Sequence, residues 1–351
     1  LFFGFKGDMG RWKQSHLFLM VFGGVSGKNM DGSTLDGPMQ KIGFFLVPDF
    51  SFIAFSSAIE PLRLTNRVAN SDLYGWSCYS RDGEPVKASN GLKIEVDGSF
   101  SDVEVLPSVI VCGGVAIHEQ ADPKLIAKLR RLSSHGASLG AVCTGSRILA
   151  QAGLLDGYTC TIHWENMDGF AEEFPDIEVS DDLFEIDRNR FTCAGGTSAL
   201  DMMLHIIARQ CGHDTASLVS DMMIHHRIRD GHERQRMALR TRLGVSHPKL
   251  LAVISHMEET LEEPVSCAEL AKSVHLSTRQ LERLFRKYLD HAPTRYYLEL
   301  RLSRARFLLL QTSMPILDVA LACGFVSASH FSKCYREYFE RTPSEERRVV
   351  V

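Results

Sequence analysis

Two helix-turn-helix patterns follow one another near the C-terminus, and they constrain the fold more than any other feature. The first covers residues 267–288 and the second covers residues 316–339. Each combines a short apolar run at helical spacing, a tight turn, a Ser at an N-cap position (Ser277, Ser327) and a second amphipathic helix. The second turn has Gly324 where a left-handed residue is needed. Two such matches in tandem predict an all-α C-terminal domain.

The second helix of each motif has an apolar face and a polar, partly basic face. A helix of this kind can lie in the major groove of DNA with its apolar face packed on its own domain. The residues that we expect to contact DNA are Thr278, Arg279, Glu282, Arg283 and Arg286 in the first motif, and Ala328, Ser329, Ser332 and Lys333 in the second. Because Ala328 offers only apolar contact, we expect the second helix to discriminate less sharply.

The segment between the motifs, residues 293–310, predicts one long amphipathic helix that begins at Pro293. With this helix and the closing sequence Phe-Glu-Arg-Thr-Pro-Ser (339–344), residues 247–348 resemble an AraC/XylS-type DNA-binding domain. The resemblance implies two recognition helices about 34 Å apart, which enter successive major grooves on one face of the DNA.

Charge and cysteine content agree with such a protein. The formal net charge is −4, but residues 247–351 hold more Lys and Arg than Asp and Glu. A further Arg-rich stretch precedes them, which we interpret either as phosphate-binding charge or as a solvated linker helix: Arg227, Arg229, Arg234, Arg236, Arg240 and Arg242. The nine cysteines include no Cys-x-x-Cys pair and no metal-binding spacing, which predicts reduced thiols, no metal site and a cytoplasmic location.

The region before the helical domain alternates between strand and helix patterns. Strands are predicted at 41–47, 76–79, 92–96, 109–112 and 138–142, and helices at 56–68, at 123–134 and from about 144. This order predicts an α/β fold with a mostly parallel sheet flanked by helices. We expect residues 1–38 to be an unstructured extension, 39–211 to form the α/β domain, and 212–246 to be a linker with a helical segment. No run of residues predicts a membrane span.

The most informative site of this domain is the strand-to-helix junction at Gly140–Ser146. A small-residue run, Cys143 and then a Gly one turn into a helix are typical of a nucleophile elbow, and a helix N-terminus is expected to lower the pKa of the thiol. Residues 39–211 resemble the PfpI-like branch of the class I glutamine amidotransferase superfamily, closest to the form fused to AraC-type domains in GlxA-like regulators. The resemblance lies in segments 47–51, 59–63, 112–114, 141–145, 152–157, 161–164 and 193–196.

A working hydrolase needs a base beside the nucleophile and a group that orients the base. His163 is the candidate base, but Ala54 occupies the position that aligns with the superfamily's acid. Glu60 in the following helix could replace the acid or pair with Arg63. Three interpretations stay open: retained catalysis, a ligand-binding cavity built from the old site, or a purely structural or dimerising domain. We predict ligand binding without catalysis, cofactor or metal, by Gly113, Gly114, Cys143, Thr144, His163 and Trp164.

Segment 48–66 resembles the subgroup of these regulators that governs catabolism of glycine betaine, carnitine or arginine. That resemblance implies a quaternary amine or an amino acid as effector. Trp164 would face the cation, and N–H groups near Gly113, Gly114 and Thr144 would bind the carboxylate. The sequence thus predicts a homodimeric transcriptional activator that binds promoter DNA, a small-molecule effector and RNA polymerase. The alternative is a cysteine-dependent amidase or deglycase-like enzyme that also binds DNA.

Overall fold

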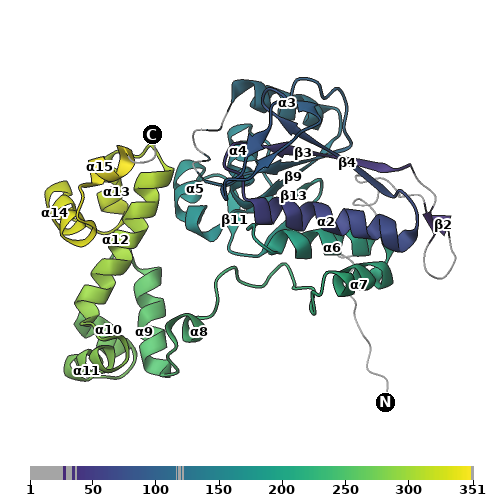
Figure 1. Ribbon diagram of the computed structural model, residues 1–351. Helices are drawn as coiled ribbons and strands as arrows, with labels where there is room; N and C mark the ends of the chain where they lie inside the picture. The colour runs from purple at the N-terminus through teal and green to yellow at the C-terminus, as the bar shows by residue number, and fades with distance from the viewer. Residues whose placement is uncertain are drawn as a thin grey trace, which may run out of the picture. The chain divides into compact units, whose positions relative to one another are not determined.

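The computed structural model describes residues 27–28, 34–35, 38–115, 117, 120 and 122–348 (Figure 1). The chain forms two compact units, residues 1–235 and residues 236–351. Most of the extension predicted at 1–38 lies outside the described residues. Within it, β1 (Gly27–Lys28) and β2 (Thr34–Leu35) form a short antiparallel pair. Within the described part of the chain, no helix is long and apolar enough to span a bilayer.

The first unit is built on a seven-stranded sheet in the order β12-β13-β9-β8-β3-β4-β7. Every neighbouring pair is parallel except β12 with β13, which are joined antiparallel at one edge. The strands are β3 (Gln40–Leu46), β4 (Tyr74–Ser80), β7 (Gly98–Ser99), β8 (Ser108–Cys112), β9 (Ser138–Val142), β12 (Phe184–Asp187) and β13 (Arg190–Cys193). The predicted α/β fold with a mostly parallel sheet is confirmed.

Helices cover both faces of the sheet. Successive side chains of a strand point to opposite faces, so each strand packs against both helical layers. Phe44 and Ile110 pack on the face that carries α2 (Phe52–Ala69), α6 (Ser198–Cys211) and α7 (His213–Met222). Phe45 and Val111 pack on the face that carries α3 (Pro123–Ser134), α4 (Ser146–Gln151) and α5 (Met167–Glu173). These two layers are visible in Figure 1. Apolar strands buried on both faces therefore hold the sheet together.

Some short elements differ from the prediction. The strand predicted at 92–96 is only β6 (Lys93–Ile94), which pairs with β5 (Val86–Lys87) outside the main sheet. A separate parallel pair, β10 (Thr159–Thr161) and β11 (Glu178–Ser180), was not predicted. Strands of two to four residues have too few side chains to show an alternating pattern.

The predicted linker at 212–246 is divided between the two units. Helix α7 packs on α2 and α6, and residues 223–235 lie on the first unit. The fully buried Asp201 accepts hydrogen bonds from the backbone N–H and guanidinium of Arg229 and from His225. We call residues 225–235 the C-terminal strap. Four of the six arginines of the Arg-rich stretch form internal ion pairs, with Asp201, Glu233, Asp181 and Glu258. Arg229 and Arg242 are therefore partners of acidic groups within their own units, whereas the side chains of Arg227 and Arg234 are 66% and 85% exposed, and for these two both interpretations stay predictions.

The second unit is helical and contains two cores. One joins α8 (Leu239–Leu243), α9 (Pro248–Glu259), α10 (Cys267–Ser273) and α11 (Thr278–Leu289). The other joins α13 (Ile316–Ala322) and α14 (Ala328–Phe339), and α15 (Pro343–Arg348) packs beside it. The long helix α12 (Pro293–Gln311) contributes Tyr297 to the first core and Leu302 to the second. The two predicted motifs and their connecting helix are thus present.

The ends of the motif helices are fixed by local hydrogen bonds. The Ser277 hydroxyl accepts from the Gln280 backbone N–H in a capping box, and the Ser327 hydroxyl accepts from the His330 backbone N–H. Gly324 has φ 72°, and a Cβ there would lie 2.5 Å from Pro264 Cγ and 2.7 Å from the Leu261 carbonyl oxygen. The second turn therefore needs glycine both for its backbone angle and for the space that it leaves.

Replacing Gly324 and a control glycine by alanine separates the requirement for a left-handed backbone from the requirement for space. Gly244 has a similar φ of 66° but nothing within 4 Å of a built Cβ, so it is a matched control. We expect Gly244→Ala to lower the free energy of unfolding by roughly 1–2 kcal/mol, from the left-handed backbone alone. Gly324→Ala should cost about 1–3 kcal/mol more, because atoms must move. Urea denaturation of the unit 236–351 measures both. Equal losses would show that the contact with Pro264 contributes nothing.

Candidate functional site

The junction after β9 brings most of the predicted ligand-binding residues together at the carboxyl edge of the sheet. Cys143 has a left-handed backbone, φ 60°, at the point where β9 turns through a short 3-10 helix (Cys143–Gly145) into α4. The turn is closely packed on two sides. A Cβ at Gly113 would lie 2.4 Å from the Gly145 nitrogen, and one at Gly195 would lie 2.7 Å from the Cys143 Cβ. The glycines are therefore required by close approach of the backbones.

Cys143 is protonated at neutral pH, contrary to the prediction of a lowered pKa. Its side chain is buried, with the residue 8% exposed. Burial, reinforced by the neighbouring Cys193, raises the pKa of the thiol to about 12. The Thr144 backbone N–H and the Ser51 hydroxyl favour the thiolate, but they only reduce this shift. Because the thiol is shielded from water, desolvation raises its pKa by more than the helix N-terminus lowers it.

The groups that would activate Cys143 are not arranged for catalysis. His163 is at the N-cap of a 3-10 helix (Trp164–Asn166), where its Nδ1 accepts a hydrogen bond from the Glu165 backbone N–H at 3.4 Å. Burial lowers the pKa of His163. Among the residues that the structure describes, no hydrogen bond joins the Cys143 sulfur to the His163 ring. The superfamily's acid is absent, since Ala54 is fully buried in the core and Glu60 pairs with Arg63 on the surface.

Two of the expected carboxylate donors, the N–H groups of Gly113 and Thr144, are already engaged. The Gly113 N–H donates to the Val142 carbonyl at 3.2 Å, and the Thr144 N–H faces the Cys143 sulfur. The Thr144 hydroxyl donates to the Gly114 carbonyl at 2.8 Å. Hence the N–H groups of Gly113 and Thr144 are not available to a carboxylate in this conformation, whereas the predicted role of the Gly114 N–H stays a prediction.

Sequence reasoning missed three residues of this site. Ser51 is the N-cap of α2, and its hydroxyl also contacts the Cys143 thiol. Cys193 ends β13 beside the same thiol. Glu165 has a carboxylate oxygen 3.8 Å from His163 Nδ1. Ser51 carried a signal as a Ser before an apolar helix, and Cys193 lies in one of the segments that carry the family resemblance. Glu165 comes close through a turn.

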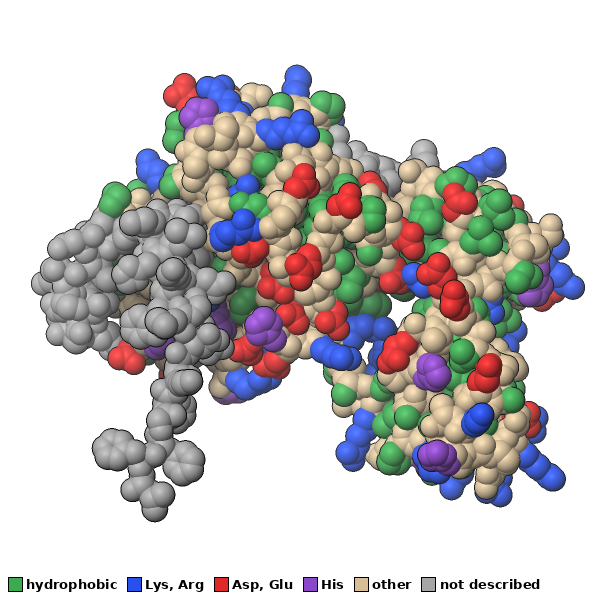
Figure 2. Space-filling model, turned by 180° about the vertical axis from the view of Figure 1, so that it is seen from behind, with side chains coloured by type: hydrophobic (Ala, Val, Ile, Leu, Met, Phe, Trp, Pro, Cys, Tyr) green, Lys and Arg blue, Asp and Glu red, His purple; other side chains and the backbone are tan. Residues whose placement is uncertain are grey.

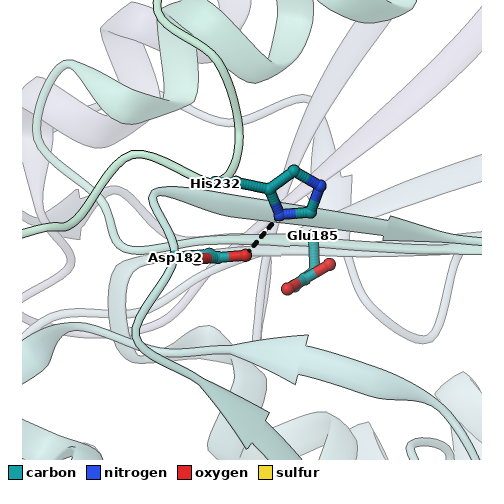
Figure 3. A group of neighbouring side chains, drawn as sticks. All are labelled: Asp182, Glu185 and His232. Carbon is teal, nitrogen blue, oxygen red and sulfur yellow. Dashed lines mark hydrogen bonds and ion pairs between the residues drawn. The ribbon is translucent and has the colours of Figure 1, made fainter.

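A second group of polar side chains joins the strap to the turn between β11 and β12 (Figure 3). Asp182, Glu185 and His232 each offer a ligand atom within 4.8 Å of the others, so they could hold a metal ion. Their side chains also have hydrogen-bond partners without an ion. His232 Nδ1 lies 2.6 Å from Asp182 Oδ2, and Ser180 donates to Glu185 at 2.7 Å. The carboxylate of Asp182 raises the pKa of His232. We interpret the group as a set of interactions that holds the C-terminal strap against the β11–β12 turn.

The candidate DNA interface is formed by the exposed faces of α11 and α14. In α11, Leu281 and Phe285 are fully buried, whereas the five predicted contact residues are exposed: Thr278, Arg279, Glu282, Arg283 and Arg286. In α14, Phe331 and Tyr335 are buried. Its predicted contact residues Ser329 and Lys333 are exposed, and Ala328 and Ser332 are half-buried. Figure 2 shows Lys and Arg side chains on the part of the second unit where α10 and α11 lie.

Comparisons with known proteins agree with the α/β fold of the first unit and the helix-turn-helix motifs of the second. Residues 41–209 match the DJ-1/PfpI family, and residues 270–348 match a family described as a helix-turn-helix domain. The chain is 50% identical over 308 residues to the HTH-type transcriptional regulator GbdR of Pseudomonas aeruginosa, which covers 88% of this chain and 84% of that protein. The chain belongs to this family of transcriptional regulators.

Two further relatives have the same breadth of match. The regulator is 45% identical over 311 residues to CdhR of Pseudomonas aeruginosa, covering 89% of this chain and 92% of CdhR. It is 38% identical over 311 residues to GlxA of Rhizobium meliloti, covering 88% and 96%. All three are named HTH-type transcriptional regulators, which confirms the predicted architecture and the predicted class of function, a regulator and not an enzyme.

Proposed function

We propose that the regulator reads promoter DNA with α11 and α14, and that a small nitrogen-containing metabolite bound beside Cys143 controls it. The observation that carries the DNA half is the division of both helices into a buried apolar face and an exposed polar face. In α11 that exposed face holds three arginines and one glutamate, side chains that hydrogen-bond to base edges and phosphates. Recognition by α11 is accordingly the stronger of the two.

The proposed effector carries a cationic group, because its site would combine an aromatic ring with a negative charge. Trp164 and Glu165 are adjacent in one turn, directly after His163, whose pKa is lowered by burial. The ring centroids of His163 and Trp164 are 5.7 Å apart. A quaternary ammonium or an amino group binds favourably over such rings beside a carboxylate. This chemistry supports a betaine or an amino acid as the effector class.

The buried thiol contributes shape and weak polarity to this site. A nucleophile needs a thiolate or a base in reach, and Cys143 has a pKa of about 12. Burial of the thiol therefore disfavours the cysteine-dependent amidase or deglycase alternative. We further propose that the regulator acts in the cytoplasm as a homodimeric activator that contacts RNA polymerase, in line with the resemblance to ligand-responsive regulators.

The DNA half is tested with Arg283→Ala. Loss of a bidentate contact to a guanine should weaken binding by about 1–3 kcal/mol and relax sequence preference at one or two base pairs. Selection from a randomised duplex library, followed by affinity measurements at fixed salt, gives both quantities. Arg63→Ala is the matched control, since Arg63 pairs with Glu60 on the surface of α2 in the first unit, outside both recognition helices. Uniform weakening on all sequences would make Arg283 a phosphate contact and contradict the proposal.

The effector half is tested by thermal denaturation in the presence of betaines, amino acids and simple amines. A true effector at 100 times its Kd should stabilise the protein by about 2.7 kcal/mol. Glu165→Gln should weaken binding by about tenfold, because a charge-assisted contact is lost. The exposed Glu178→Gln on β11 is the control and should bind normally. Stabilisation by neutral analogues alone, or unchanged binding by Glu165→Gln, would overturn the assignment.

A further inference from the structure

The turn that precedes α14 carries an apolar side chain that is almost fully exposed. Val326 is 91% exposed, whereas Phe325 beside it is 2% exposed and lies in the second core of the unit. Val326 directly precedes Ser327, the N-cap of α14. An aliphatic side chain held this far from its own core gains nothing from folding.

Comparison of the two motifs shows that Val326 is an added residue. In the first motif, three residues (274–276) separate the end of α10 from the N-cap Ser277. In the second, four residues (323–326) separate the end of α13 from the N-cap Ser327. His275 and Gly324 both have positive φ, and Leu276 and Phe325 both pack on their cores, so these positions correspond. Val326 has no counterpart in the first turn.

The position of Val326 limits what it can meet on DNA. The N-terminal end of a recognition helix is the part that approaches base edges in the major groove. The side chain of valine cannot donate a hydrogen bond to a phosphate. The apolar group that the bases present in this groove is the C5-methyl of thymine. The neighbouring residues of α14 are small, namely Ala328 and Ser329, so they leave space for a base edge to approach.

We propose that Val326 is a specificity-determining residue that contacts the C5-methyl group of a thymine in the half-site bound by α14. This inference rests on the proposed docking of α14 in the major groove. It assigns to the second motif an apolar form of recognition, whereas the first motif recognises bases with charged side chains.

The test uses the full chain and the duplex that it selects from a randomised library. Each thymine is replaced in turn by deoxyuracil, which removes only the methyl group. At one position we expect a three- to fivefold loss of affinity for the unchanged protein, the size of one buried methyl group. Val326→Ala should bind the original duplex with a similar loss and should be insensitive to deoxyuracil at that position. Leu317→Ala is the control, because Leu317 is also exposed, at 51%, but lies on α13.

The outcomes separate this inference from the function on which it rests. If Arg283→Ala changes the selected sequence while no deoxyuracil position couples to Val326, the thymine contact is wrong and the docking of α11 stands. If neither variant changes sequence preference, both proposals fail. If Val326→Ala alters promoter activation but not DNA affinity, Val326 contacts a protein instead, and the inference is overturned. Because Val326 is exposed, the free energy of unfolding of Val326→Ala should equal that of the unchanged protein.

Discussion

The left-handed backbone of Cys143 is the constraint on which the first unit's site depends. It turns the chain at the end of β9. Neighbouring atoms lie so close to Gly113, Gly145 and Gly195 that a side chain would not fit at these positions. The same close packing that builds an elbow also excludes water from the thiol. Desolvation then outweighs the favourable N–H of Thr144 and raises the pKa of the thiol to about 12. A geometry typical of nucleophiles thus holds a neutral side chain, which fits a regulator better than a hydrolase.

The elements with strong local signals were predictable from the sequence. Apolar runs at 41–47 and 109–112 gave β3 and β8, and Ser277 and Ser327 marked the starts of α11 and α14. The pKa of Cys143 was not predictable, because burial depends on residues far away in sequence such as Ser51 and Cys193. Short strands were missed for a different reason, since two to four residues carry no readable period.

The Arg-rich stretch shows the limit of counting charges. Its arginines were interpreted either as phosphate-binding charge or as a solvated linker helix, but Arg229 satisfies the buried Asp201 and Arg242 pairs with Glu258. A buried carboxylate needs such partners, and removing one is strongly destabilising. Sequence gives the number of charges, whereas the structure gives their partners. Exposed charges are found in the recognition helices, such as Arg279 and Arg283, and also in the stretch itself, such as Arg234.

The central claim is that Cys143 is a neutral residue of a binding site, and the pH dependence of its alkylation tests this most directly. Iodoacetamide reacts with the thiolate, and burial, which raises the pKa of Cys143, keeps this form scarce at neutral pH. Mass spectrometry of the folded protein should show half-buried Cys267 and Cys334 labelled well before Cys143 at pH 8. Labelling of Cys143 ahead of both, with a midpoint below its ordinary pKa of about 8.5, would contradict the account.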